Sequence, residues 1–147
     1  MIQVAYQTGT LYFHKVYLNL YDEFDSTTLF KPLITITSQL TGKSKTFVVF
    51  SVFSTNKERW LECLIATTTT LSENLSAGVI ILGTTDFPLG FYDMTIYENS
   101  SNSNLDPSGL NVVYTGLMNL YSTTSPSVTY SEYTTNDSDT ESVYITI

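Results

Sequence analysis

The sequence predicts an all-β protein built from about 7–9 short, mainly antiparallel strands that pack as a β-sandwich. The first observation is the choice of apolar residues, which are mainly Val, Ile, Phe and Tyr, with 11 tyrosines and 8 phenylalanines. These β-branched and aromatic side chains suit the pleated surface of a strand, whereas good helix formers are scarce. The second observation is that the apolar stretches are short, alternate with a period of two and are separated by turn residues. A chain of 147 residues is expected to form one domain, residues 1–147.

The first half of the chain contains four of the expected strands. Ile34 and Ile36 lie on one face of the second strand, and the Thr41-Gly42-Lys43 segment that follows is a tight turn of the kind found in hairpins. The third strand is apolar on both faces, which is typical of a central strand. The four strands cover residues 11–20, 33–40, 45–53 and 60–67.

Five further strands are expected in the second half of the chain. Residues 86–94 resemble the tyrosine corner of immunoglobulin-like sandwiches, in which a tyrosine hydroxyl ties a corner to the backbone upstream. Tyr92 stands two residues before Met94, which takes the place of the usual inward-facing cysteine. The predicted sandwich is therefore immunoglobulin-like or similar. The five strands cover residues 79–82, 90–98, 110–121, 128–133 and 143–147. The predicted core contains Phe47, Val49, Trp60, Leu64, Ile80, Tyr92, Met94 and Ile96.

The environment of the protein is predicted from its cysteine content and its hydropathy pattern. Cys63 is the only cysteine and lies in an apolar run, so we expect a small core residue and no internal disulfide bond. The N-terminal residues lack the pattern of a signal peptide, and no apolar run approaches the roughly 18 residues of a membrane span. We therefore expect a soluble protein that is made in a reducing cytoplasm and has no membrane partner.

Charge is distributed unevenly along the chain. The first 59 residues carry 6 bases and 4 acids, for a charge of +2, and the remaining 88 carry 10 acids and no base, for −10, which gives the net charge of −8. An acidic chain repels phosphate, so nucleic acid is not expected as a partner. The six bases are Lys15, Lys31, Lys43, Lys45, Lys57 and Arg59.

The residues offer little for catalysis. His14 is the only histidine, and with no second histidine and no nucleophile motif it is expected to be structural. A zinc site needs several Cys and His ligands, and the chain has one of each. The glycines are scattered at turns and form no phosphate-binding loop. We therefore predict that the protein is not an enzyme and uses no cofactor.

Two groups of oxygen-bearing side chains have the i, i+2, i+4 spacing with which a calcium loop begins. The first group lacks the glycine and the distal glutamate that complete such a loop. Because Asn and Asp are also the residues that turns require, we expect a turn-rich loop for the first group and a solvated acidic tip for the second. The first group is Asn102, Asn104 and Asp106, and the second is Asp137, Asp139 and Glu141.

Three segments carry sequence motifs in a fixed order. Residues 40–47 contain a TG-x-SK-x-F hairpin pattern, residues 90–98 are similar to a G-[FY]-Y-x-[YF]-x-I-Y-E strand, and residues 103–110 are similar to an S-x-N-L-[DN]-P loop. Together they resemble a family of short proteins encoded in the virion-structure modules of tailed phages, notably crAss-like and related phages of Bacteroidetes. The chain departs from that family at Tyr114 and Leu117, where the family often has an acid and a base.

The resemblance implies a β-sandwich that serves as an auxiliary capsid (decoration) protein on the virion surface and is assembled in the cytoplasm of the host bacterium. Its partners would be the major capsid protein, other virion proteins or copies of itself. The family has no active-site motif, so no functional residue is transferred. One alternative is a carbohydrate-binding or host-adhesion module of a phage tail or fibre, with exposed tyrosines as a stacking platform. A second alternative is a structural subunit of the connector or tail.

A partner contact is predicted from the charge distribution. Lys43, Lys45 and Arg59 belong to hairpins and loops that gather at the ends of the sheets in a sandwich. We predict that these residues face an acidic surface of the capsid protein or of a neighbouring copy, where they orient docking and make it sensitive to salt. The alternative is that all three are ordinary solvated turn residues.

Overall fold

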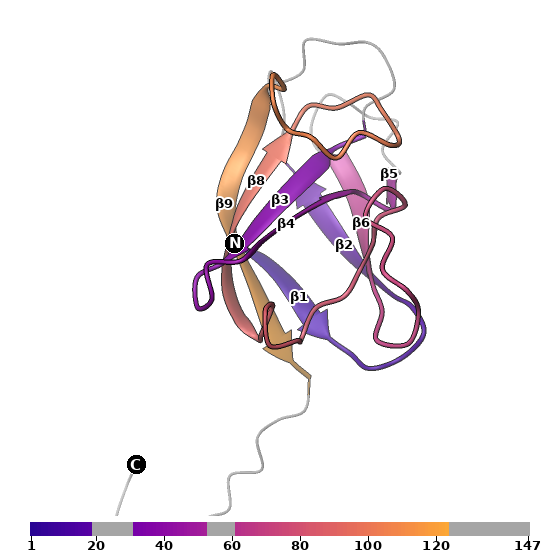
Figure 1. The fold of residues 1–147 in the computed structure, drawn as a ribbon, viewed down its shortest axis with the longest axis vertical. Coiled ribbons are helices and arrows are strands. Elements are labelled where there is room, and N and C mark those ends of the chain that lie inside the picture. Colours follow the sequence, from indigo (N-terminus) through magenta and orange to yellow (C-terminus); the bar gives the residue numbers. More distant parts are fainter. Residues whose placement is uncertain (19–30, 53–60, 124–147) are drawn as a thin grey trace, which may run out of the picture.

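The computed structural model of the chain describes residues 1–18, 31–52 and 61–123, and every regular element in these ranges is a β-strand (Figure 1). The prediction of an all-β protein is confirmed. The strands form two sheets. The first has the order β1-β9-β8-β3-β4 and comprises β1 (Ile2–Tyr6), β9 (Val112–Ser122), β8 (Gly90–Tyr97), β3 (Leu33–Ser38) and β4 (Ser44–Val48). The second has the order β2-β6-β5, with β7 paired to β6, and comprises β2 (Tyr12–Leu18), β6 (Leu61–Thr67), β5 (Ser51–Val52) and β7 (Val79–Ile80).

Strand pairing is antiparallel apart from two parallel pairs, β1 with β9 and β6 with β7, among the strands in the described ranges. β3 and β4 form the predicted hairpin, in which the Ser38 amide donates to the Lys43 carbonyl oxygen (2.9 Å). Gly42 adopts a φ of 70° in this turn, a left-handed conformation that glycine enters without steric cost. The residue types at 41–43 therefore specify the turn, as the sequence indicates.

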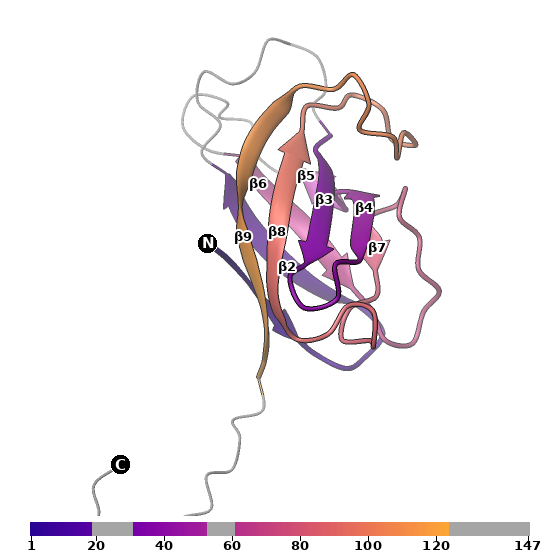
Figure 2. The same ribbon diagram turned by 60° about the vertical axis from the view of Figure 1, so that its left-hand side comes forward.

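One hydrophobic core contains side chains from both sheets. Figure 2 shows β2 and β6 passing behind β9, β8 and β3. Alternation along β8 explains its contribution, because Tyr92, Met94 and Ile96 are buried while Phe91 and Asp93 are exposed. The buried members of the core are Val4, Val16, Leu18, Ile34, Ile36, Phe47, Val49, Cys63, Ile65, Ile80, Leu82, Tyr92, Met94, Ile96, Val113, Met118 and Leu120.

The predicted core residues are confirmed at six positions: Phe47, Val49, Ile80, Tyr92, Met94 and Ile96. The prediction for Leu64 is wrong. Leu64 is only half-buried, because its neighbours Cys63 and Ile65 point into the core and strand alternation turns Leu64 to the other face of β6. Trp60 lies outside the described residues.

The chain crosses from one sheet to the other within the expected strand 45–53, which is therefore two strands, β4 and β5. The Val49 amide donates to the Pro32 carbonyl oxygen (3.1 Å), beside β3. The next amide, that of Phe50, donates to the Leu64 carbonyl oxygen of β6 (2.9 Å). A continuous apolar run is thus divided between two sheets that share one core.

One strand of the structure, β1, is not among the strands expected from the sequence. β1 pairs in parallel with β9, from Ile2 opposite Met118 to Tyr6 opposite Ser122, and Val4 is fully buried. The alternation of Ile2, Val4 and Tyr6 is the signal for this strand in the sequence. The expected strands 128–133 and 143–147 lie outside the described residues.

Tyr92 ties the start of β8 to the preceding loop. Its hydroxyl donates a hydrogen bond to the Pro88 carbonyl oxygen (2.5 Å), and burial raises the pKa of the hydroxyl to about 12. This is the hydrogen bond that the sequence predicts for a tyrosine corner. It lies where the chain enters the first sheet after β7, so it fixes the direction of β8.

Cys63 is a buried core residue, as predicted. Its side chain has no exposed surface, and burial, together with the nearby Glu62 charge, raises the pKa of the thiol to about 12. Since the thiolate is the reactive form, burial and the raised pKa disfavour reaction of Cys63 in the folded protein.

Candidate functional site

His14 makes a structural contact between two strands of the second sheet. Its side chain is half-buried, and its Nε2 atom lies 2.9 Å from the Thr67 hydroxyl oxygen on β6. Burial lowers the pKa of His14 below its ordinary value of 6.5. The neutral imidazole is thereby favoured in the folded protein.

The stability of the protein is expected to decrease through His14 as the pH falls from about 7 toward the lowered pKa of this residue in the folded state. The pKa of histidine is 6.5 in the unfolded chain and lower in the folded one, so between these values the unfolded state binds more protons. The His14 contribution is therefore complete above 6.5 and is lost as the pH falls toward the folded pKa. Thermal melts across this range should show a shallower pH dependence for His14→Gln than for the wild type. Equal slopes for the two proteins would contradict the assignment.

The loop that contains Asn102, Asn104 and Asp106 is a series of turns. The Asn104 side-chain oxygen accepts from the Asp106 amide (3.0 Å), and an Asp106 carboxylate oxygen accepts from the Ser108 amide (3.0 Å). Hydrogen bonds from the Ser108 amide and hydroxyl group lower the pKa of Asp106. Backbone donors therefore occupy oxygen atoms that a cation would need, in line with the expected turn-rich loop. Within residues 1–18, 31–52 and 61–123, no group of three or more His, Cys, Asp or Glu side chains could hold a metal ion. Asp137, Asp139 and Glu141 lie outside these ranges.

Lys45 is enclosed by groups of its own chain and is not presented to a partner, which corrects the predicted contact. Its side chain is only 8% exposed and its ammonium group forms an ion pair with Glu73. The same group donates to the Ile81 carbonyl oxygen (2.7 Å) and lies 4.3 Å from the centre of the Phe87 ring. Glu73 in turn accepts from the Ile81 amide (2.9 Å). Lys45 therefore joins β4 to the two loops on either side of β7.

The three basic residues predicted to form one contact have different surroundings. Lys43 is exposed on the β3–β4 turn, where its amide donates to the Thr41 hydroxyl oxygen (3.3 Å). Lys45 is enclosed, and Arg59 lies outside the described residues. Lys43 is thus the one member of this set that the structure places on the surface.

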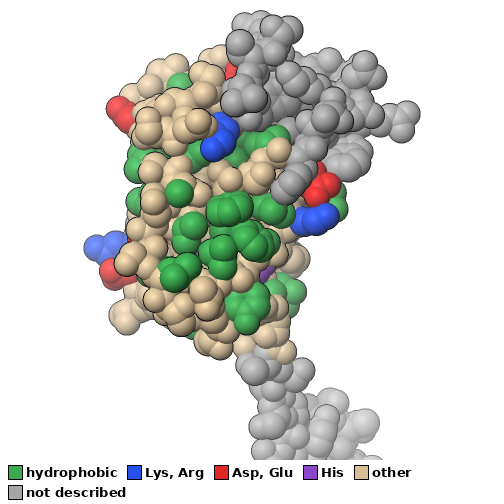
Figure 3. Space-filling model, turned by 90° about the vertical axis from the view of Figure 1, so that its right-hand side faces the viewer, with side chains coloured by type: hydrophobic (Ala, Val, Ile, Leu, Met, Phe, Trp, Pro, Cys, Tyr) green, Lys and Arg blue, Asp and Glu red, His purple; other side chains and the backbone are tan. Residues whose placement is uncertain are grey.

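An apolar patch lies on the outer face of the second sheet, the face turned away from the core. Phe13 of β2 is 49% exposed, and its ring lies 5.0 Å from that of Phe50, centre to centre, at an interplanar angle of 55°. Leu64 belongs to the same face and is half-buried. We call these three residues the Phe13 patch. Figure 3 shows hydrophobic side chains gathered on this side of the molecule.

The Phe13 patch is bordered by an ion pair. Lys15 and Glu62, on the adjacent strands β2 and β6, approach to 2.9 Å on the same face. Hydrogen bonding to Glu62 and its charge raise the pKa of Lys15. The sequence analysis did not single out Phe13, although Phe13, Lys15 and Tyr17 share the outward face of one alternating strand. Two exposed aromatic residues on either side of a charged one, Phe13 and Tyr17 around Lys15, are the signal that could have identified it.

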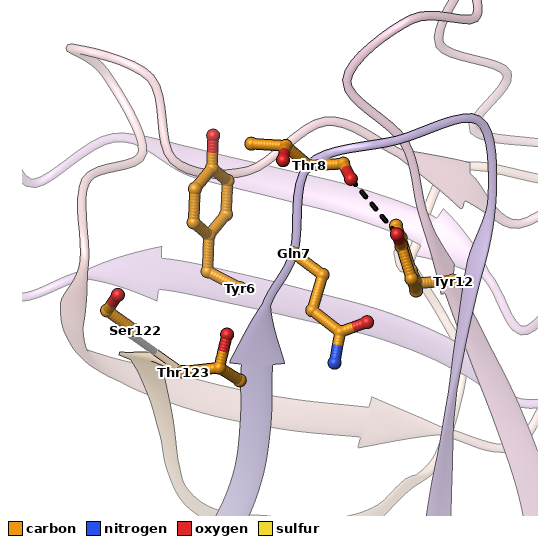
Figure 4. Close-up of a pocket in the computed structure, with 6 residues that line it drawn as sticks. All are labelled: Tyr6, Gln7, Thr8, Tyr12, Ser122 and Thr123. Atoms are coloured by element: carbon orange, nitrogen blue, oxygen red, sulfur yellow. Dashed lines mark hydrogen bonds between the residues drawn. The ribbon is translucent and has the colours of Figure 1, made fainter. Parts of the chain in front are cut away.

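A groove with a volume of about 400 Å³ opens at the end of β1, the start of β2 and the end of β9. Figure 4 shows the side chains around it, with the Gln7 amide between the rings of Tyr6 and Tyr12 in this view. The Tyr12 hydroxyl donates to the Thr8 carbonyl oxygen (3.0 Å). Tyr6 and Tyr12 are among the tyrosines from which the sequence suggests a stacking platform, and the fold brings them to one place. The lining residues are Tyr6, Gln7, Thr8, Tyr12, Ser122 and Thr123.

Comparison with known proteins adds no identification. No protein-family model, no curated protein and no solved structure matches this chain. The part of the chain that the structure describes contains no helix long and apolar enough to span a membrane.

Proposed function

We propose that this chain is a structural protein of a tailed-phage virion, an auxiliary capsid protein that binds the major capsid lattice through the Phe13 patch. The observation that carries the proposal is the half-exposed Phe13 ring, which packs against Phe50 on the outer face of the second sheet. Protein contacts are commonly centred on an aromatic anchor with a polar rim, and here the Lys15–Glu62 ion pair supplies part of that rim. Binding by surface complementarity requires no catalytic group.

We also propose that the two sheets form a β-sandwich of the immunoglobulin type. The orders β9-β8-β3-β4 and β2-β6-β5 correspond to the strand orders G-F-C-C′ and B-E-D of that fold. The Tyr92 hydrogen bond to Pro88 falls at the start of the strand equivalent to F, where a tyrosine corner belongs. A core shared by both sheets also supports this assignment.

The resemblance to phage virion proteins supports the proposal through the first sheet. The three resembling segments are the β3–β4 hairpin, β8, and the loop that leads to β9. The residues that carry the motifs include Gly42 of the turn and the buried Tyr92 and Ile96. The motifs thus consist largely of positions that shape the sheet. The Phe13 patch belongs to the second sheet, and none of its residues lies in the three motifs. The resemblance therefore does not extend to the patch.

The proposal is tested by the composition of purified virions and by a matched pair of variants. We expect the protein at a fixed, high copy number relative to the major capsid protein. Phe13→Ser should reduce incorporation by about tenfold or more when the protein is limiting, because removal of a central aromatic anchor costs about 2 kcal/mol or more. Phe91→Ser is the control, since Phe91 is also 49% exposed but lies on β8 of the first sheet. Thermal melts would verify that both variants are folded.

Three outcomes would count against this function. Absence of the protein from virions would refute it outright. Equal incorporation of Phe13→Ser and Phe91→Ser would remove the Phe13 patch as the contact. A low copy number with a location in the tail, connector or fibre would replace decoration by one of the alternatives that the sequence leaves open.

A further inference from the structure

We infer that the groove formed by Tyr6, Gln7, Thr8, Tyr12, Ser122 and Thr123 is a binding site for a neutral saccharide. The inference goes beyond the proposed capsid contact, because its residues belong to the end of β1, the start of β2 and the end of β9, and none of them is part of the Phe13 patch. Its volume of about 400 Å³ falls in the range of small-molecule sites.

The two aromatic rings of the groove pack closely against glycines. A Cβ atom at Gly83 would lie 2.3 Å from the Tyr6 ring, and a Cβ atom at Gly9 would lie 2.7 Å from the Tyr12 ring. Each ring therefore occupies space that the side chain of any larger residue would fill at the position of the glycine. The Tyr12 hydroxyl is also bonded to the Thr8 carbonyl oxygen. Fixed rings lose little conformational entropy when a ligand binds, which favours affinity.

The polar groups of the groove suit a ligand that both donates and accepts hydrogen bonds. The Gln7 side chain offers two donors and an acceptor, and it makes no hydrogen bond to any residue that the structure describes. The hydroxyl of Tyr6 is likewise without a partner among the described residues. A bound hydroxyl group could therefore pair with Gln7 or Tyr6 without displacing an existing contact.

The absence of charged side chains from the lining of the groove argues against ionic ligands. None of the six lining side chains carries a charge, so neither an anionic nor a cationic ligand would find a counter-charge there. A sugar ring presents an apolar C–H face to an aromatic ring and hydroxyl groups around its edge. This combination matches two tyrosine rings flanked by an amide and by hydroxyl groups.

The test is a titration of the whole ¹⁵N-labelled chain with neutral mono- and disaccharides, followed by amide chemical shifts. We expect a Kd on the order of 1 mM for a single sugar unit. The shifts should be confined to residues 6–9, 12, 83 and 122–123. A charged sugar acid of the same size should bind more weakly. The inference is overturned if no neutral saccharide shifts these amides at several times that concentration, or if the sugar acid binds more tightly.

A set of variants separates this site from the capsid contact. Gln7→Ala should weaken saccharide binding by about tenfold, the loss expected for one removed hydrogen-bonding partner. Tyr121→Ala is the control, because Tyr121 is 42% exposed on the same strand as Ser122 but does not line the groove. Unchanged affinity in Gln7→Ala would overturn the inference. Phe13→Ser should bind the saccharide normally. Virion incorporation of Phe13→Ser therefore tests the capsid proposal, and the saccharide affinity of Gln7→Ala tests this one separately.

Discussion

Replacement of Tyr92 by alanine is expected to lower the free energy of unfolding by about 3 to 5 kcal/mol, which makes it one of the two most damaging single substitutions that we predict. Tyr92 has no exposed surface and packs in the core with Met94 and Ile96. The variant would leave a cavity and would also lose the hydrogen bond to the Pro88 carbonyl oxygen. Urea denaturation measures the change, and Tm should fall by roughly 2 to 4 °C per kcal/mol.

Tyr92→Phe is the matched control for this prediction. It keeps the ring in the core and removes only the hydroxyl group, so it should cost about 1 kcal/mol. The difference between the two variants separates core packing from the corner hydrogen bond. If Tyr92→Ala were as stable as Tyr92→Phe, the ring would not be the main contribution of this residue.

Replacement of Gly78 by alanine is expected to cost roughly 2 to 5 kcal/mol, the second large effect. Gly78 adopts a φ of +75° at the end of the turn before β7. A Cβ atom there would lie 2.4 Å from the Phe50 amide nitrogen and 2.6 Å from the Val48 carbonyl oxygen. Both contacts are with backbone atoms at the point where the chain crosses between the sheets, so they cannot be relieved by a rotamer change.

Gly42→Ala separates the two causes of the Gly78 effect. Gly42 has a similar φ of +70°, but an added Cβ atom would meet no other atom within 4 Å. This variant should therefore show only the cost of the left-handed conformation, about 1 kcal/mol. Chemical denaturation of the two variants gives the comparison. A Gly78→Ala cost no larger than that of Gly42→Ala would mean that the crossover segment moves aside.

Alternation in the sequence predicts much of the core, because each strand that it identifies has one face directed inward. Tyr92, Met94 and Ile96 are correct for this reason. The same reasoning fails where the apolar run is continuous. Residues 45–53 offer no alternation to show that Val49 and Phe50 bond to different sheets, since either face of such a run can be buried. The assignment of Leu64 fails similarly, because that strand is apolar on both faces.

The candidate sites were less predictable than the core, because they depend on contacts between distant parts of the chain. The basic cluster around the β3–β4 hairpin is visible in the sequence, but the pairing of Lys45 with Glu73, 28 positions away, is a property of the fold. The groove likewise joins residues 6–12 to residues 122–123. Abundant tyrosines suggested a stacking platform without showing which of them would meet.

The parallel pairing of β1 with β9 has a consequence for the order of folding. Ile2 lies opposite Met118, so β1 acquires this neighbour only after nearly all of the described chain has been made. Contacts of such large sequence separation raise the entropic cost of the folding transition state and place domains of this kind among the slower folders, in the range of milliseconds to seconds. During synthesis the edge of β1 stays unpaired, and exposed strand edges promote association between incomplete chains. Slow release of β9 from the ribosome would then lengthen the time during which incomplete chains can associate.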